Sequence, residues 1–175
     1  MNNWYVITGG PCSGKTTTVD MLAQLGYRTA IEDARHYLDV QRLEGHSVDE
    51  VRKRQAEFQH EVLRMQLAQE ATLDPNETVF LDRAVPDSLA YYRFLGLEPD
   101  AQLTDALQRV SYRKVFLLAL LPLVPDYART EDPQAQTRIH SLLTEVYESL
   151  PFPVVHVPRV GPEERVEFIL DRLMT

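Results

Sequence analysis

The fold of this chain follows from Gly9-Gly10-Pro11-Cys12-Ser13-Gly14-Lys15-Thr16, which has the spacing G-x-x-x-x-G-K-T. Glycines at these positions let backbone N–H groups curl around an anion without a Cβ in the way. An apolar, β-prone run at 4–8 precedes the stretch, and 16–25 follow it with apolar residues at close to helical spacing. Strand, glycine turn and helix together predict a phosphate-binding loop, with the positive end of the helix directed at the same anion.

The residues of this loop have specific expected roles. Lys15 is expected to reach the β- and γ-phosphates of a nucleoside triphosphate, and the Thr16 hydroxyl to ligate Mg²⁺. The backbone from Gly9 to Thr17 is expected to surround the phosphates. The alternative is a plain glycine turn with an exposed lysine. The strand and helix predicted on either side favour the phosphate-binding loop over this alternative.

Composition limits the classes of function that the chain can have. Its 175 residues, 44% hydrophobic and 25% charged, suit one globular domain over 1–175. A net charge of −8 argues against non-specific binding to nucleic acid or anionic membranes, which needs a basic face. The only cysteine, Cys12, excludes an internal disulfide framework and fits a reducing cytoplasm.

No export signal or membrane span is expected. The N-terminus lacks a basic segment followed by a long apolar stretch. The longest apolar run, 115–124, is too short to cross a bilayer and contains Pro122. The sequence therefore predicts a cytoplasmic protein, and it leaves the oligomeric state open.

Strand-like runs alternate with helix-like stretches along the chain. Strands are expected at 4–8, 27–31, 78–81, 114–120 and 153–157, and helices at 16–25, 34–40, 47–73, 86–94, 100–110, 133–149 and 162–174. This alternation predicts an α/β fold with a five-stranded parallel sheet and helices on both faces. For a sheet that carries such a phosphate-binding loop, the expected strand order is 2-3-1-4-5. The region 122–138, which begins as an irregular polar loop, is expected to form a lid.

Charged side chains follow the second and third predicted strands, at the edge of the sheet where ligands gather. Asp82 is expected to hold Mg²⁺, directly or through water, or alternatively to cap the next helix. Arg83 is expected to neutralise phosphate charge, or alternatively to pair with a nearby carboxylate. Glu32 or Asp33 would take the proton from an acceptor hydroxyl, although both could simply be acids at a helix N-terminus.

Other side chains are candidates for contacts with an acceptor or with the transferring group. Arg35 could bind an anionic group of the acceptor, and Arg129 could reach the transferring phosphoryl group from the lid. Phe58 and Tyr91 could stack on a flat ring, and Gln59 could read the edge of a base. The alternatives are solvated charges for the two arginines and core positions for the others.

The segment from Asp82 to Tyr91 resembles the D-R-x-x-x-D/S-S/T-x-A-Y stretch of phosphate-loop nucleoside and nucleotide kinases, including thymidylate kinases. The whole chain is similar, more specifically, to the small AAA-type ATPase and kinase-like family that includes the nicotinamide riboside kinase domain. Shared with that family are the G-G-P-x-S-G-K-T loop and the segments 32–35 (E-x-A-R), 58–59 (F-Q), 82–87 (D-R-x-x-P-D), 129–131 (R-x-E/D) and 157–165 (V-P to E-R). Ala84 stands where thymidylate kinases usually carry an aromatic residue, which argues against thymidine monophosphate as the acceptor.

The resemblance implies a kinase that uses Mg²⁺ with ATP, or alternatively GTP. Its phosphoryl group would go to a small nucleoside- or nucleotide-like acceptor, whose identity the resemblance does not give. The alternative is an ATP- or GTP-binding regulatory switch with slow hydrolysis. The chain lacks N-K-x-D, the base-reading motif of common GTPases, which makes the switch the weaker hypothesis.

Overall fold

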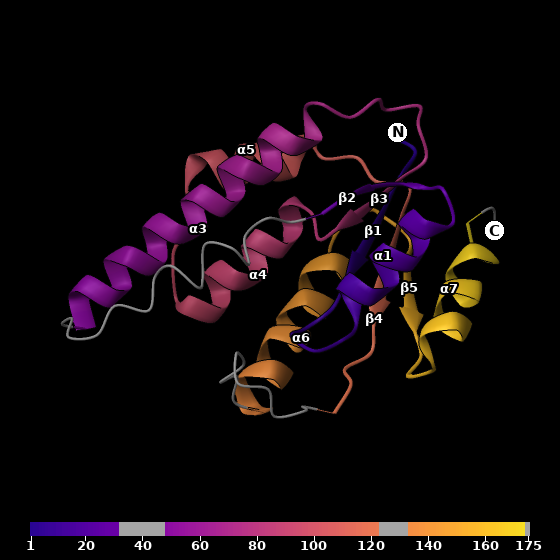
Figure 1. The fold of residues 1–175 in the computed structure, drawn as a ribbon. Helices are drawn as coiled ribbons and strands as arrows, with labels where there is room; N and C mark the ends of the chain where they lie inside the picture. Colours follow the sequence, from indigo (N-terminus) through magenta and orange to yellow (C-terminus); the bar gives the residue numbers. More distant parts are fainter. Residues whose placement is uncertain (32–47, 123–132, 174–175) are drawn as a thin grey trace.

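The computed structural model describes residues 1–31, 48–122 and 133–173. Five parallel strands form one sheet in the order β2-β3-β1-β4-β5 (Figure 1). The strands are β1 (Trp4–Thr8), β2 (Arg28–Ala30), β3 (Val79–Asp82), β4 (Lys114–Leu118) and β5 (Val154–Val157). The predicted α/β class, parallel sheet and strand order are confirmed.

The helices alternate with the strands along the chain. They are α1 (Lys15–Gln24), α3 (Val48–Glu70), α4 (Val85–Leu95), α5 (Ala101–Arg109), α6 (Pro133–Glu148) and α7 (Pro162–Leu170). Most predicted boundaries are correct to within three residues, while the predicted helix at 34–40 lies outside the described residues. Strand β4 ends two residues earlier than predicted, because the chain turns toward the glycine-rich loop, where the Leu121 N–H donates to the Cys12 carbonyl at 3.0 Å.

Helices cover both faces of the sheet. Successive strand residues point to opposite faces, so Val6 packs on the side of α4 and α6, whereas Ile7 packs on the side of α1 and α7. Strands β1 and β4 are buried along their whole length, as expected for the inner strands of such a sheet. This three-layer packing fixes the direction of the strands, and therefore the edge at which their carboxyl ends meet.

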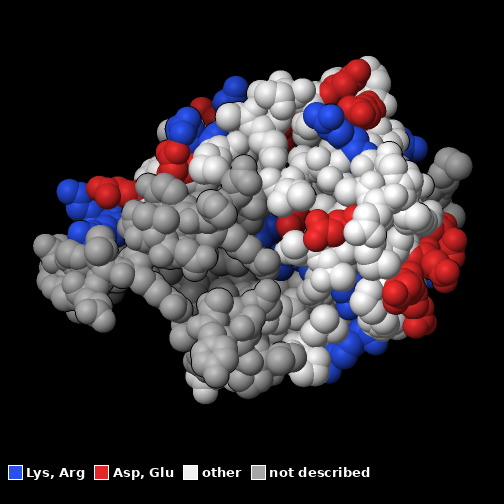
Figure 2. All heavy atoms as spheres, viewed as in Figure 1, with Lys and Arg blue, Asp and Glu red and all other residues white. Residues whose placement is uncertain are grey.

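A smaller helical layer lies beyond α4. Leu63 of α3, Tyr92 of α4 and Leu103 of α5 are buried together in a separate apolar cluster, and Figure 1 shows α3 and α5 side by side. Among the described residues, no helix combines the length and apolar character needed to cross a bilayer. Figure 2 shows acidic and basic side chains interspersed on one face, with acidic side chains gathered over α7 and the residue after it. The exposed acids there are Glu163, Glu164 and Glu167 of α7, and Asp171.

Candidate functional site

The glycine-rich loop and Asp82 lie next to each other at the carboxyl edge of the sheet. Ile7 of β1 is directly opposite Asp82 of β3 in the strand register. The loop begins two residues after Ile7, at Gly9, and Asp82 is the last residue of its strand, with 6% of its surface exposed. The sequence therefore correctly predicted that these two segments meet, which is the arrangement in which parallel α/β sheets bind ligands.

The loop passes into α1 through Gly14. This residue has φ 82°, and a Cβ on it would lie 2.2 Å from Nη1 of Arg165, so any other residue would be strained here and would displace the guanidinium. Thr16, which is partly exposed, and Thr17, which is exposed, are in the first turn of α1. Among the described residues, no side chain caps this helix and no acidic residue lies in its first turn. The N–H groups and positive end of α1 therefore suit a bound anion.

Lys15 is folded into the loop. Its side chain is 4% exposed, and Nζ donates hydrogen bonds to the carbonyl of Gly9 at 2.7 Å and to that of Gly10 at 2.9 Å. Ser13 Oγ accepts a third hydrogen bond from the same Nζ at 3.3 Å. A buried ammonium needs such oxygen partners, and these hold its charge at the loop, where a phosphate would be bound.

Helix α6 holds the outer side of the loop. Gln136 Nε2 donates to the Pro11 carbonyl at 2.8 Å, and the Gly10 N–H donates to Nδ1 of His140 at 3.2 Å. Burial, with smaller effects of the Lys15 and His156 charges, lowers the pKa of His140. Gln136 and His140 were not among the predicted site residues, and polar residues four positions apart are too common on amphipathic helices to single them out.

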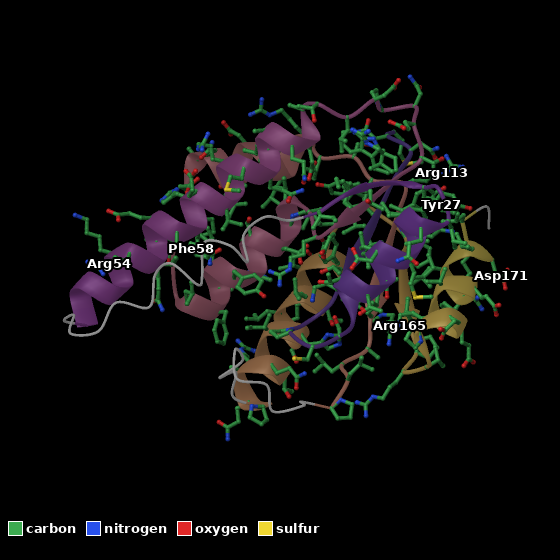
Figure 3. All side chains as sticks on the ribbon, in the orientation of Figure 1. Tyr27, Arg54, Phe58, Arg113, Arg165 and Asp171 are labelled. Carbon is green, nitrogen blue, oxygen red and sulfur yellow. The ribbon has the colours of Figure 1, made fainter. Side chains whose placement is uncertain are left out.

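Helix α7 holds the other side of the loop through Arg165, which is 3% exposed. Its guanidinium donates to the Gly14 carbonyl and to Thr18 Oγ1, both at 3.4 Å, and to the Val160 carbonyl at 3.2 Å. Figure 3 shows Arg165 between α7 and α1. Burial lowers the pKa of this guanidinium, which nevertheless stays charged at any physiological pH. Arg165 thus connects the start of α1 to the segment that follows β5.

Arg83 occupies a strained turn directly after β3. Its φ is 66°, a left-handed conformation that is unfavourable for a residue with a Cβ. Its N–H donates to the Ile7 carbonyl at 3.0 Å, and its guanidinium carbon lies 5.2 Å from the centre of the Tyr91 ring. Two predicted site residues, Arg83 and Tyr91, are therefore in contact, in a geometry that allows a cation–π interaction.

Asp87 holds this turn in place. Its Oδ1 accepts from Thr8 Oγ1 at 2.7 Å, and its Oδ2 accepts from the Ala84 N–H at 3.1 Å and from the Tyr147 hydroxyl. The carboxylate that caps the start of α4 is thus that of Asp87, in the role that the sequence left open for Asp82. Asp87 links the last residue of β1 to the turn after β3. Asp87 is part of the D-R-x-x-P-D segment at 82–87, but no role was predicted for it.

The remaining predicted residues fall into two groups. Phe58 is half-buried and Gln59 is buried, and Figure 3 shows Phe58 on the middle part of α3. Tyr91 is half-buried and packs against the main core, as the alternative prediction had it, and it also contacts Arg83. Glu32, Asp33, Arg35 and Arg129 lie outside the described residues, and their roles stay predictions.

Comparisons with known proteins agree with this geometry. Deoxyadenosine kinase from M. mycoides with bound dATP has a TM-score of 0.68 and 16% identity, over 98% of this chain and 99% of that one. Thymidylate kinase from Ehrlichia chaffeensis has a TM-score of 0.67 and 13% identity, over 98% of each chain. A NadR protein in complex with NR has a TM-score of 0.65 and 17% identity, over 96% of this chain and 49% of that one. At these identities the similarity shows the fold.

The sequence itself gives the family. A comparison with curated protein sequences gives no match. The sequence profile of the family described as "AAA domain" matches residues 4–165, a range that contains the glycine-rich loop, Asp82, Arg83, His140 and Arg165. The resemblance to an AAA-type family is thereby confirmed, and this chain belongs to the AAA-domain family with a phosphate-loop fold.

Proposed function

We propose that this protein is a kinase that transfers the γ-phosphoryl group of ATP to a small nucleoside- or nucleotide-like acceptor. The observation that carries the proposal is the juxtaposition of the loop around Lys15 with the Asp82–Arg83 turn at one edge of the sheet. The similar structures add support, since they are a deoxyadenosine kinase, a thymidylate kinase and a NadR protein bound to NR.

The loop would bind the triphosphate. Backbone N–H groups from Gly9 to Thr17, other than the Gly10 N–H that bonds to His140, would surround the phosphates. Lys15 would exchange some of its bonds to loop oxygens for bonds to phosphate oxygens. Thr16 and Asp82 are hard oxygen donors from adjacent segments, which fits Mg²⁺. When bound, Mg²⁺ would neutralise charge on the phosphates. GTP would fit the same phosphate contacts, because none of these residues reads a base.

The chain would contribute to transfer mainly by positioning and by charge. Arg83, oriented by the Tyr91 ring, would stabilise negative charge on the transferring group, with Arg129 as a second cation. The acceptor oxygen forms a bond to the γ-phosphorus, the bond from that phosphorus to the β–γ bridging oxygen breaks, and ADP leaves. Glu32 or Asp33 would take the acceptor's proton.

The acceptor would lie beside the same turn. Phe58 and Tyr91 offer ring faces for stacking, and Gln59 offers an amide for a base edge. Arg35 would bind an anionic group, such as a phosphate on a nucleotide acceptor. These assignments predict a planar acceptor with a free hydroxyl or phosphate.

The test is ADP release with a panel of acceptors. The protein is incubated with Mg-ATP and, one at a time, with nucleosides, nucleoside monophosphates and small phosphorylated metabolites. We expect one class to accelerate ADP release well above the rate without acceptor, and Asp82→Asn to abolish the acceleration. A rate that no acceptor raises would contradict the kinase and favour a nucleotide-dependent switch.

A further inference from the structure

We propose that His140 is a positioning residue for the phosphate-binding loop. Its neutral imidazole accepts the Gly10 N–H and thereby holds the peptide group on which the position of Lys15 depends. The inference rests on the proposed nucleotide-binding role of the loop, and it adds a requirement on a helix distant from it in sequence. Nucleotide affinity would depend on a hydrogen-bond acceptor at position 140.

The Gly9–Gly10 peptide group is held at both of its polar ends. Its carbonyl, on Gly9, accepts from Lys15 Nζ at 2.7 Å, and its N–H, on Gly10, donates to His140 Nδ1 at 3.2 Å. These two groups belong to one rigid plane, because the peptide bond does not rotate freely. A rotation that released the N–H would also move the carbonyl away from the Lys15 ammonium.

The contact between α6 and the loop is also close and directional. Gln136 and His140 are one helical turn apart, so they share a face of α6 and contact Pro11 and Gly10 in turn. A Cβ on Gly10 would lie 2.9 Å from Cβ of His140, so the loop backbone packs directly on this helix. Gln136 also donates to the Leu121 carbonyl at 3.2 Å, which ties the segment after β4 to the same face.

Only one protonation state of His140 can act in this way. Nδ1 accepts when the proton is on Nε2, whereas an imidazolium would direct a second N–H at the Gly10 N–H. The charged and titratable groups that act on His140 from neighbouring elements are Lys15, at the start of α1, and His156 of β5, which pairs with Glu148 of α6 at 3.0 Å.

These surroundings favour the acceptor form. Burial, followed by the Lys15 and His156 charges, lowers the pKa of His140 below its ordinary value of 6.5. His140 therefore becomes protonated at a higher pH in the unfolded chain than in the folded one. As the pH falls below 6.5, the free energy of unfolding therefore decreases. The hydrogen bond to Gly10 should be intact at neutral pH and should be lost as the pH falls through the pKa of the folded protein.

The test compares the full-length protein with His140→Asn and His140→Leu. Asn places Oδ1 close to the position of Nδ1 and cannot be protonated in this range, whereas Leu removes the acceptor. Calorimetry at about pH 7.5 should show Mg-ADP binding about tenfold weaker for His140→Leu, and within about threefold of wild type for His140→Asn. As the pH falls from 6.5 through the lowered pKa of His140, wild-type affinity should fall relative to His140→Asn.

A readout without nucleotide separates this inference from the proposed function. The Gly10 amide proton resonance should shift with the titration of His140 in wild type and should stay constant over the same pH range in His140→Asn. His156→Asn, which removes the neighbouring histidine, should keep the titration of Gly10. If wild type bound no nucleotide, the proposed function would fail, while the Gly10 titration would still decide the role of His140.

Two results would overturn the inference. One is a His140→Asn variant that binds Mg-ADP as weakly as His140→Leu. The other is a Gly10 resonance with the same pH dependence in wild type and in His140→Asn. If His140→Leu did not fold, the comparison of wild type with His140→Asn would decide alone.

Discussion

Two turns at the ends of neighbouring strands make up the described part of the site, and they are stabilised in different ways. The glycine-rich loop after β1 contains Cys12 at φ 57°, and the turn after β3 contains Arg83 at φ 66°. The loop is built from its own glycines and Lys15, and Gln136, His140 and Arg165 also bond to it from α6 and α7. The turn depends on Asp87 and its bonds to Thr8 and Tyr147, which come from other elements.

The difference has a physical reason. A left-handed residue with a Cβ costs about 1–2 kcal/mol, so each turn needs surrounding bonds that leave it no better conformation. In the loop, two other residues with positive φ, Gly9 and Gly14, are glycines and therefore do not carry this cost. In the turn after β3, the Ile7 carbonyl and the Asp87 carboxylate accept the two successive N–H groups of Arg83 and Ala84. The turn should therefore be the more sensitive of the two to the loss of one supporting side chain, that of Asp87.

The largest effect is expected at Lys15, in the loop. Lys15→Met should lower kcat/KM for phosphoryl transfer about a thousandfold, about 4 kcal/mol, because the phosphates lose their main cation. The fold should persist, since the glycines still form the loop. Steady-state kinetics and a thermal melt check both points, with Lys53→Met on the exposed side of α3 as the control. If Lys53→Met lost as much activity as Lys15→Met, the assignment of Lys15 as the main cation for the phosphates would be wrong.

The next effect is expected at Asp87, in the turn. Asp87→Ala leaves three buried donors without their acceptor, the Thr8 hydroxyl, the Ala84 N–H and the Tyr147 hydroxyl. We expect the free energy of unfolding to fall by about 3 kcal/mol, as measured by urea denaturation. Tyr147→Phe, which removes one of these bonds, should cost about 1 kcal/mol. If the Asp87→Ala midpoint matched that of wild type, the turn would not depend on this carboxylate.

Consecutive motifs could be recognised from the sequence, whereas hydrogen bonds between distant residues could not. The loop can be recognised in the sequence because its eight residues are consecutive, and the parallel α/β sheet follows from the alternation of strands and helices. The bonds of Asp87 to Thr8, of Gln136 to Pro11 and of His140 to Gly10 join residues 79, 125 and 130 positions apart. Periodicity reports which face of a helix is buried, but not which polar group on that face meets a distant backbone.

A smaller effect is expected at Gly14, where the loop touches α7. Gly14→Ala adds a Cβ at φ 82° and 2.2 Å from Arg165 Nη1, so the free energy of unfolding should fall by about 2 kcal/mol or more. Gly26 is a matched control, because it has φ 92° but no atom within 4 Å of its added Cβ. Gly26→Ala should cost about 1 kcal/mol, the backbone strain alone. Equal costs at the two glycines would show that Arg165 moves aside freely.

The smallest effect concerns pH and a second carboxyl group near the turn, that of Glu70. It accepts from Gln66 Nε2 at 2.9 Å and from the Tyr112 hydroxyl at 3.0 Å, and burial raises its pKa above the ordinary 4.5. Its contribution to stability is therefore full below pH 4.5 and is lost as the pH rises through the pKa of the folded state.

Glu70→Gln should remove that pH dependence and should stay within about 1 kcal/mol of wild type at neutral pH. Urea denaturation across mildly acidic to neutral pH measures the slope. Glu61→Gln, at an exposed position whose carboxyl pKa is lowered by Arg64, should leave the slope above about pH 5 unchanged. An unaltered slope in Glu70→Gln would contradict the assignment to Glu70.

The central claim is that the loop passes a phosphoryl group to an acceptor held beside the Asp82–Arg83 turn. Its most direct test supplies ATP labelled with ³²P in the γ-phosphate, together with the acceptor that most accelerates ADP release. We expect label in the acceptor with wild type and none with Lys15→Met. Label that appears only as inorganic phosphate, at a rate the acceptor does not change, would contradict it.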